Sequence, residues 1–186
     1  RVVGCVGTMT NWYLREPMLN YLALLVRRID RIKILIVTAE DHGRLRADAE
    51  RSGVDPRRIV LTRAEFHEMP ELLRLVDVGL FFIKVCFSKK GSAATKLGEF
   101  LATGVPVIIN DRVGDSGSIV REGRVGVVLP DVTPEAFEAS LDAVRQVLSD
   151  SEIARRCRDV ARHHFDLARG VSSYDGVYSR IITIRA

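Results

Sequence analysis

A loop rich in lysine and small residues runs directly into an apolar helix in the stretch SKKGSAATKLGEFLATGVPVIIN, residues 88–110. The basic side chains in and just before this stretch are those of Lys84, Lys89, Lys90 and Lys96. The small residues among them, which let a backbone approach a ligand closely, are Gly91, Ser92 and Thr95. A helix start adds unpaired N–H groups and a partial positive charge. The segment is therefore suited to bind an anion, and its charge is enough for a diphosphate.

Glu99 lies one turn into the same helix and needs a separate explanation, because a carboxylate does not bind an anion. A carboxylate accepts hydrogen bonds well from two neighbouring hydroxyl groups, such as those of a ribose. Phosphates at the helix start and a ribose on Glu99 would together describe a bound nucleotide. The simpler alternative is a solvated lysine loop and a carboxylate that interacts favourably with the helix dipole. That alternative explains the lysines alone, whereas the whole arrangement favours a nucleotide.

Apolar runs and helical patterns alternate along the chain, and these elements must position the loop. Strands are predicted from apolar, β-branched runs at 2–6, 33–38, 58–62, 77–83, 105–110 and 125–129. Helices are predicted at 17–29, 41–52, 68–76, 95–103, 115–122, 134–148, 150–165 and 172–182. Uniformly apolar strands are typical of a parallel sheet buried on both faces. The pattern therefore predicts an α/β fold over 1–186: one doubly wound, Rossmann-like domain with about six parallel strands and helices on both faces.

Ligands of such sheets bind at the carboxyl ends of the strands. Gly7 and Thr8 directly follow the first predicted strand, and the 84–95 loop follows the fourth. Both segments should therefore lie at the same edge, and we expect them to share one site. Trp12 and Tyr13, which follow the glycine turn, are expected to pack against the first helix, and stacking on a sugar is the alternative.

Composition narrows the class of protein further. The 186 residues carry a net charge of +4 without a long basic run, and aromatic residues make up 6%, which argues against a nucleic-acid partner. Three widely spaced cysteines, Cys5, Cys86 and Cys157, predict reduced thiols in a cytoplasmic protein. The sequence has neither a membrane span nor a signal peptide, and neither a His-x-x-x-His nor an Asp-x-Asp pattern, so no metal is expected.

A dinucleotide-binding oxidoreductase is a poor fit. Such an enzyme needs Gly-x-Gly-x-x-Gly after the first strand, and this chain has only Gly4 and Gly7 there. Glu40 and Asp41 follow the second strand, where a ribose-binding acid would lie. Without the glycines, these two residues are better explained as the start of the next helix.

The segment ATKLGEFLATGVPVIIN resembles the Pro-Thr-Lys-Leu-x-Glu-Tyr-x-Ala-x-Gly-x-Pro-Val segment of group 1 glycosyltransferases, the retaining sugar transferases of the GT-B fold. DVGLFFIK, VGDSGSIV, VGTMTNWYLREPML and YDGVYSRI fall where that family has comparable segments. The resemblance covers nearly the whole chain. It implies the C-terminal, donor-nucleotide half of a two-domain enzyme. The chain opens on an apolar run without Met, so we expect a longer protein whose N-terminal half brings the acceptor site.

The resemblance also implies roles for individual residues. Glu99 matches the residue that binds the ribose hydroxyls, and Gly7 and Thr8 match the turn that approaches the diphosphate and sugar. Thr95, Lys96 and the backbone of Leu97 match the contacts to the donor phosphates, with Thr95 and Lys96 stabilising the leaving diphosphate. The nucleobase edge would be read after the third strand, from Arg63 through Ala64 to Glu65, mostly by backbone.

The chain departs from the family pattern at several positions. Gly91 stands where many members have a glutamate that faces the transferred sugar, and Ala94 replaces the usual proline. The stretch 8–13 has no charged residue, although many members carry an arginine and a lysine there for the diphosphate. The candidates to replace those cations are Arg15, Lys84, Lys89 and Lys90.

The implied function is metal-independent, cofactor-free hexosyl transfer with retention, from a nucleotide-diphosphate sugar to a cell-surface polysaccharide or glycolipid. The sequence leaves open whether the donor carries uridine, guanosine or adenosine. The expected partners are the nucleotide-sugar and an N-terminal acceptor domain, toward which the helices within 151–182 would pack. The chain alone should be inactive. A basic helix face, formed by Arg155, Arg156, Arg158 and Arg162, is either solvated or a peripheral contact with the inner face of the membrane.

Two other functions stay open at this point. One is a sugar-nucleotide epimerase built on the same two-domain architecture, which would need further acids and a histidine in its site. The other is a non-catalytic module that binds a nucleotide or phosphate and transfers nothing.

Overall fold

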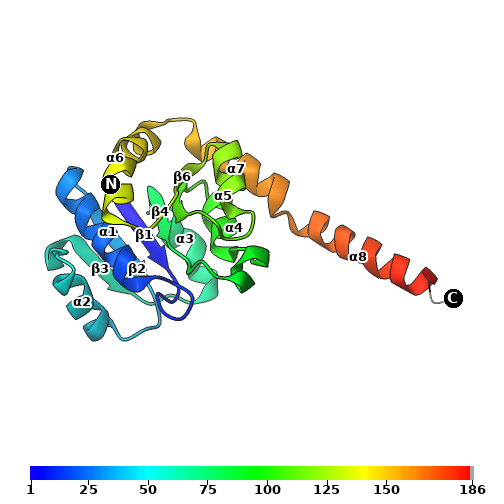
Figure 1. The fold of residues 1–186 in the computed structure, drawn as a ribbon, viewed down its shortest axis with the longest axis horizontal. Helices are drawn as coiled ribbons and strands as arrows, with labels where there is room; N and C mark the ends of the chain where they lie inside the picture. Colours follow the sequence, from blue (N-terminus) through cyan, green and yellow to red (C-terminus); the bar gives the residue numbers. More distant parts are fainter. Residues whose placement is uncertain (185–186) are drawn as a thin grey trace.

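The computed structural model describes residues 1–184 and contains a six-stranded sheet surrounded by helices (Figure 1). The strands are β1 (Val2–Val6), β2 (Lys33–Val37), β3 (Ile59–Thr62), β4 (Val78–Phe81), β5 (Val107–Asn110) and β6 (Gly126–Leu129). Every neighbouring pair is parallel, and the order in the sheet is β3-β2-β1-β4-β5-β6. The predicted doubly wound α/β fold is confirmed.

The strand order creates a switch point between β1 and β4. From β1 the chain builds outward through β2 to β3, then crosses back to place β4 beside β1, and builds outward again to β6. The loops after β1 and β4 therefore diverge to opposite faces of the sheet. In sheets of this kind, the space outside the carboxyl ends of those two strands is where ligands bind.

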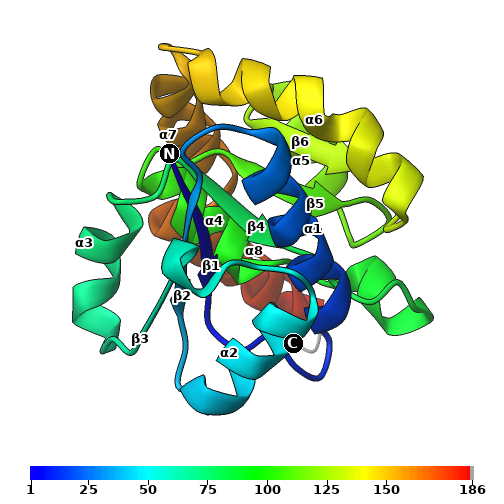
Figure 2. The ribbon, with the colours of Figure 1, turned by 90° about the vertical axis from the view of Figure 1, so that its left-hand side faces the viewer.

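Helices connect successive strands and cover the sheet. They are α1 (Arg15–Arg28), α2 (His42–Arg51), α3 (Met69–Leu73), α4 (Thr95–Ala102), α5 (Ser116–Gly123), α6 (Pro134–Ser149), α7 (Ile153–His164) and α8 (Leu167–Ile184), with short 3-10 turns η1 (Pro56–Arg58), η2 (Phe66–Glu68) and η3 (Phe87–Gly91). Helix α1 packs against α2 and α6, and α1 and α6 lie side by side in Figure 2. Helix α7 packs against α4 and α5.

Local signals explain several of the boundaries. Thr133 caps α6 by accepting a hydrogen bond from the Ala136 N–H at 3.3 Å, and Pro134 occupies the first helical position, as predicted. The predicted strand 77–83 is too long, because the chain leaves the sheet after Phe81 and pairs with another loop. The predicted helix 68–76 is likewise reduced to α3, which follows the 3-10 turn η2.

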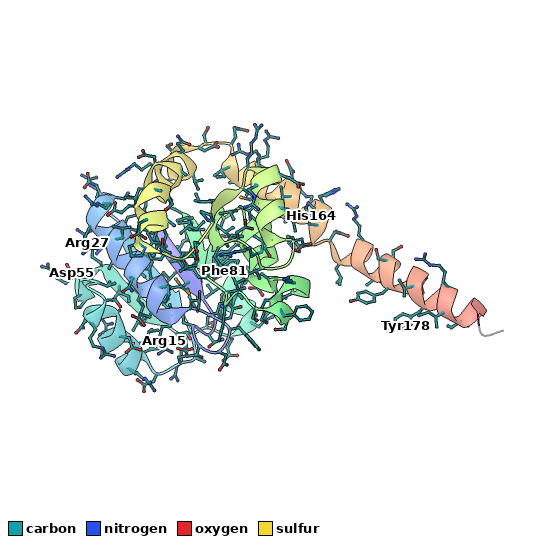
Figure 3. The ribbon with its side chains drawn as sticks, viewed as in Figure 1. Arg15, Arg27, Asp55, Phe81, His164 and Tyr178 are labelled. Carbon is teal, nitrogen blue, oxygen red and sulfur yellow. The ribbon has the colours of Figure 1, made fainter. Side chains whose placement is uncertain are left out.

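The core fixes α4 against the sheet. Gly79 of β4 lets the Phe100 ring approach, since a Cβ at this glycine would lie 2.7 Å from ring atoms of Phe100. Phe100 also stacks on Phe81, with 6.4 Å between the ring centres, and Phe81 lies in the middle of the globular body in Figure 3. The start of α4 is thereby held at the carboxyl end of β4.

Helix α8 differs from the other helices because it extends away from the globular body (Figure 1). It begins earlier than the predicted 172–182, at Leu167. Tyr178 marks its projecting part in Figure 3. Its exposed apolar side chains are Leu167, Val171, Tyr174, Val177, Tyr178, Ile181 and Ile182. Within residues 1–184, no helix combines the length and the apolar character that crossing a membrane requires.

Candidate functional site

The loops after β1 and β4 are joined by backbone hydrogen bonds at the switch point. Tyr13 and Ile83 form an isolated antiparallel bridge, and the Lys84 N–H donates to the Trp12 carbonyl oxygen at 2.8 Å. The buried side chain of Asn110 secures this exit from β4, because it accepts from the Ile83 N–H at 2.7 Å and donates to the Ile83 carbonyl oxygen at 2.9 Å. The structure therefore brings together the two segments that the sequence placed at one edge.

Lys96 connects the start of α4 to the glycine turn. Its Nζ donates to the Thr8 carbonyl oxygen at 3.1 Å and lies 3.5 Å from the centre of the Tyr13 ring. Gly7 has a φ of +75°, and a Cβ there would lie 3.1 Å from Cε of Lys96, so a glycine suits this position. Burial lowers the pKa of Lys96 to about 8, although the nearby charges of Glu99 and Glu40 oppose this shift. Lys96 is thus a partly desolvated cation placed beside a close-approach turn.

Thr95 and Glu99 lie on the neighbouring surface of α4. Ala94, which precedes the helix, makes no side-chain capping bond, while the Leu97 N–H donates to the Ala94 carbonyl oxygen at 2.9 Å. Both Thr95 and Glu99 are exposed. They line a cavity of about 580 Å³ between α4 and α7, whose other lining residues are Gly98, Ala102, Arg158, Ala161, Arg162, Phe165, Asp166 and Leu167.

Glu99 is also electrostatically linked to the glycine turn. Burial raises the pKa of Tyr13, and the charge of Glu99 raises it further. The same carboxylate acts on Lys96. Glu99 lines the cavity, and Lys96, three residues before it on α4, contacts the turn, so the cavity and the turn both adjoin this helix.

The other lysines of the loop lie on aromatic rings. Nζ of Lys89 is 4.3 Å from the centre of the Trp12 ring, and Nζ of Lys90 is 5.9 Å from that of Phe87. Trp12 is 49% exposed and so remains largely on the surface, while Tyr13 packs partly against the core. Lys84 is exposed at the start of the loop. Across residues 1–184, none of the four lysines of this segment forms an ion pair.

The turn η3 carries Lys89 and Lys90 and is supported from behind by the loop after β5. The Gly114 N–H donates to the Lys89 carbonyl oxygen at 2.9 Å. Gly114 has a φ of +50°, and a Cβ there would lie 2.1 Å from the Ser92 carbonyl oxygen. Ser92 is half-buried in this contact, whereas Gly91 is exposed.

Arg63 and Ala64 lie at the same edge of the sheet but further from the switch point. They follow β3, which is separated from β1 by β2. Arg63 is exposed, and Ala64 packs partly against the core. A ligand that reaches from Lys96 to these residues must extend across the ends of β1 and β2.

Glu40 is a residue of the site that the sequence interpretation missed. Its Oε1 accepts hydrogen bonds from the Thr8 hydroxyl at 2.6 Å, the Met9 N–H at 2.9 Å and the Thr10 hydroxyl at 3.1 Å. Asp41 alone caps α2, as it accepts from the Arg44 N–H at 2.6 Å. The available signal was an acidic residue at the end of the second strand, which the sequence interpretation assigned to the helix start.

Arg15 lies behind the glycine turn, and its guanidinium is paired with carboxylates of the protein itself. It forms ion pairs with Glu40 and, at 2.9 Å, with Asp48 of α2, and its side chain is 20% exposed. Burial alone would raise the pKa of Glu40, but the hydrogen bonds from Thr8, Met9 and Thr10 and the charge of Arg15 lower it overall. Of the cations considered as replacements in the first turn, Lys84, Lys89 and Lys90 remain available to a ligand.

In the part of the chain that the structure describes, no group of three or more His, Cys, Asp or Glu side chains could hold a metal ion. The positively charged side chains at the candidate site are those of lysines, and a helix start adds N–H donors. Their chemistry matches an anionic ligand such as a diphosphate.

Comparisons with known proteins agree with this geometry. The family model described as glycosyl transferases group 1 matches residues 1–150. No curated protein sequence gives a match. Among solved structures, a glycosyltransferase from Rickettsia africae ESF-5 is similar, with a TM-score of 0.75 at 15% identity, over 97% of this chain and 48% of that one.

Two further structures have functional descriptions. WaaG, a glycosyltransferase involved in lipopolysaccharide biosynthesis, has a TM-score of 0.66 at 20% identity, over 90% of this chain and 43% of its own. HepE of Anabaena, solved in complex with UDP-glucose, has a TM-score of 0.71 at 16% identity, over 96% of this chain and 48% of its own.

These structural similarities establish the fold, and this chain spans less than half the length of each of the three proteins. The architecture is that of a Rossmann-like domain of GT-B glycosyltransferases. Because the family model covers residues 1–150 of 186, the chain belongs to the group 1 glycosyltransferases.

Proposed function

We propose that this chain is the donor-nucleotide domain of a retaining glycosyltransferase and binds a nucleotide-diphosphate sugar outside the carboxyl ends of β1 and β4. The observation that carries the proposal is the hydrogen bond from Lys96 Nζ to the Thr8 carbonyl oxygen. This contact brings a cation, a glycine turn and a helix start to the switch point of a doubly wound sheet.

The diphosphate lies against the start of α4, with Thr95 and Lys96 as its contacts. When the bond between the sugar C1 and the diphosphate oxygen breaks, negative charge develops on that oxygen. Lys96 and the helix-start amides stabilise this charge, and this electrostatic contribution takes the place of a metal ion. Lys84, Lys89 and Lys90 add positive charge along the approach to the site.

Glu99 accepts hydrogen bonds from the ribose hydroxyls, because it is exposed one turn beyond Thr95 and lines the cavity beside α4. The nucleobase extends toward Arg63 and Ala64 at the end of β3. The complex of HepE with UDP-glucose supports uridine as the first base to test. GDP and ADP are the alternatives.

The acceptor is bound by an N-terminal domain that packs on the C-terminal helices. Helix α8 supports this arrangement, because its apolar side chains are exposed and it projects from the globular body (Figure 1). WaaG, which is involved in lipopolysaccharide biosynthesis, supports a glycolipid or polysaccharide acceptor. The arginine face of α7 is the candidate for a peripheral membrane contact.

Calorimetric titration with UDP, GDP and ADP tests this function. A charge-assisted hydrogen bond contributes about 1.5–3 kcal/mol, so Glu99→Ala should weaken binding about tenfold or more. Glu138→Ala, which removes an exposed carboxylate on α6, is the matched control and should leave binding unchanged. The proposal is wrong if the full-length protein binds none of the three nucleotides. Binding without sugar transfer by the full-length protein would instead identify a non-catalytic module.

A further inference from the structure

The glycine turn contains two threonine hydroxyls whose protons are already used. Oγ atoms of Thr8 and Thr10 are 2.7 Å apart, and both lie within hydrogen-bond distance of Oε1 of Glu40. An ionised carboxylate only accepts hydrogen bonds. Whichever threonine donates to the other, both protons remain inside this cluster of Thr8, Thr10 and Glu40.

This arrangement determines whether the turn offers hydrogen-bond donors or acceptors to a ligand. A hydroxyl whose proton is engaged can still accept a hydrogen bond through a remaining lone pair. Thr8 Oγ also accepts from the Thr10 N–H at 3.2 Å, so it keeps at most one such lone pair, whereas Thr10 Oγ keeps at least one. Phosphate oxygens are themselves acceptors, so a diphosphate gains nothing from Thr8 Oγ or Thr10 Oγ. The hydroxyl groups of a sugar can donate, and they match these oxygens.

Arg15 makes this arrangement compatible with an anionic ligand. Glu40 places a carboxylate, 17% exposed, directly behind a turn that a diphosphate would approach. The ion pair with Arg15 neutralises that charge, and Asp48 holds the other side of the guanidinium at 2.9 Å. The stretch 8–13 has no charged side chain, and Arg15, which lies two residues beyond it, acts through Glu40 rather than by touching the ligand.

We propose that Glu40 and Arg15 form a positioning pair that turns the Thr8 and Thr10 hydroxyls into hydrogen-bond acceptors for the transferred sugar. The inference rests on the proposed function and assigns the diphosphate and the sugar of the donor to different parts of its site. Lys96 and α4 bind the diphosphate, whereas the Glu40-bound turn recognises sugar hydroxyls. Glu40 thereby contributes to the discrimination between a sugar nucleotide and the bare nucleoside diphosphate.

The test compares UDP with UDP-glucose on the full-length protein. Glu40→Gln replaces the carboxylate by an amide that can donate as well as accept, so one threonine proton is released outward. We expect UDP affinity to stay within about twofold, and the affinity ratio of UDP-glucose to UDP to fall about threefold to tenfold, as loss of neutral hydrogen bonds implies. Glu138→Gln, which makes the same carboxylate-to-amide exchange on the exposed surface of α6, should leave the ratio unchanged.

Thr8 offers a second pair of variants in case Glu40→Gln fails to fold. Thr8→Val removes the accepting oxygen and should lower the same ratio, whereas Thr8→Ser keeps that oxygen and should restore it. A merely structural role would weaken UDP and UDP-glucose equally. An unchanged ratio in Thr8→Val overturns the inference while UDP binding persists. Failure of the wild-type protein to bind UDP, GDP or ADP overturns the proposed function instead.

Discussion

The lysine loop and helix α7 carry similar positive charge in the sequence but use it differently in the structure. On α7, Arg155 pairs with Glu152 at 3.0 Å, Arg162 pairs with Asp159 at 2.9 Å, and Arg156 pairs with Asp150. Lys89 and Lys90 instead lie on aromatic rings, and Lys96 lies both on the Tyr13 ring and on a carbonyl oxygen. Charge on α7 is mostly neutralised within the helix region, whereas charge in the loop remains available to a ligand.

This difference shows why spacing matters more than the number of basic residues. Arginines three or four residues from acids on a helix find partners on their own surface. Lys84, Lys89 and Lys90 have no acid at such a spacing. Lys96 has Glu99 three residues further along α4 but donates to the Thr8 carbonyl oxygen instead, and backbone contacts fix the loop at the switch point. Mutation, pH and ligand binding should therefore have large effects at the lysine loop and small effects on α7.

The largest expected effect comes from removing the cation nearest the glycine turn. Lys96→Ala should reduce affinity for a nucleoside diphosphate by about tenfold to a hundredfold, as loss of a charge-assisted hydrogen bond implies. The free nucleoside should be affected much less, because it lacks the phosphates. Calorimetric titration of both ligands measures the difference. Equal weakening of the two ligands would contradict a diphosphate role for Lys96.

The second-largest expected effect is that of pH on the affinity for a nucleoside diphosphate. Because burial lowers the pKa of Lys96 to about 8, the ligand-free protein loses this charge as pH rises through 8. A bound diphosphate favours the protonated form, so its affinity should fall above pH 8, by up to about tenfold per pH unit. Titrations at pH 7, 8 and 9 measure this effect, and Lys96→Ala should show no such fall. A wild-type affinity that is constant over this range would refute the role of the lysine charge.

A smaller effect, on the stability of the protein, is expected from a substitution in the segment that supports the lysine loop. Gly114→Ala should lower the free energy of unfolding by about 1–2 kcal/mol through its left-handed conformation alone. The clash of the added Cβ with the Ser92 carbonyl oxygen destabilises the protein further. Gly176→Ala, in the projecting helix α8, has open space around its Cβ and should stabilise by about 0.5–1 kcal/mol. Urea denaturation compares the two variants. The packing assigned to the lysine loop would be incorrect if both substitutions changed stability in the same direction.

The smallest effect is expected on α7. Arg155→Ala removes exposed ion pairs, which contribute about 0.2–1 kcal/mol in total, and should not change nucleotide affinity. The same denaturation and titration experiments apply. A loss of nucleotide binding comparable to that of Lys96→Ala would remove the distinction between the two basic regions.

The fold could be predicted from the sequence because its signals are local. The strands of the sheet are short, mostly apolar runs. Thr133 followed by Pro134 is a pattern typical of a helix start, and it predicts where α6 begins. The meeting of the Gly7 turn with the 84–95 loop followed from parallel topology, which sends both to one edge. These features depend on patterns within a few residues or on general rules of handedness.

Other features depend on contacts between distant residues, and sequence patterns do not encode them. Glu40 was assigned to a helix start because nothing near it indicates that it binds Thr8, which lies far away in the chain. The sequence offers Arg15 as a ligand cation, but its pairing with Glu40 and Asp48 depends on residues more than 20 positions away. The end of β4 was placed too late, because its last apolar residues pair with the loop that contains Trp12.

The most direct test of the central claim is amide hydrogen exchange with and without the nucleoside diphosphate that binds. The account predicts slower exchange on binding in the turn 7–14 and at 89–99, with little change along the outer face of α7 near Arg155. Protection confined to α7, with no change at the glycine turn or at the start of α4, would contradict a nucleotide site at the switch point.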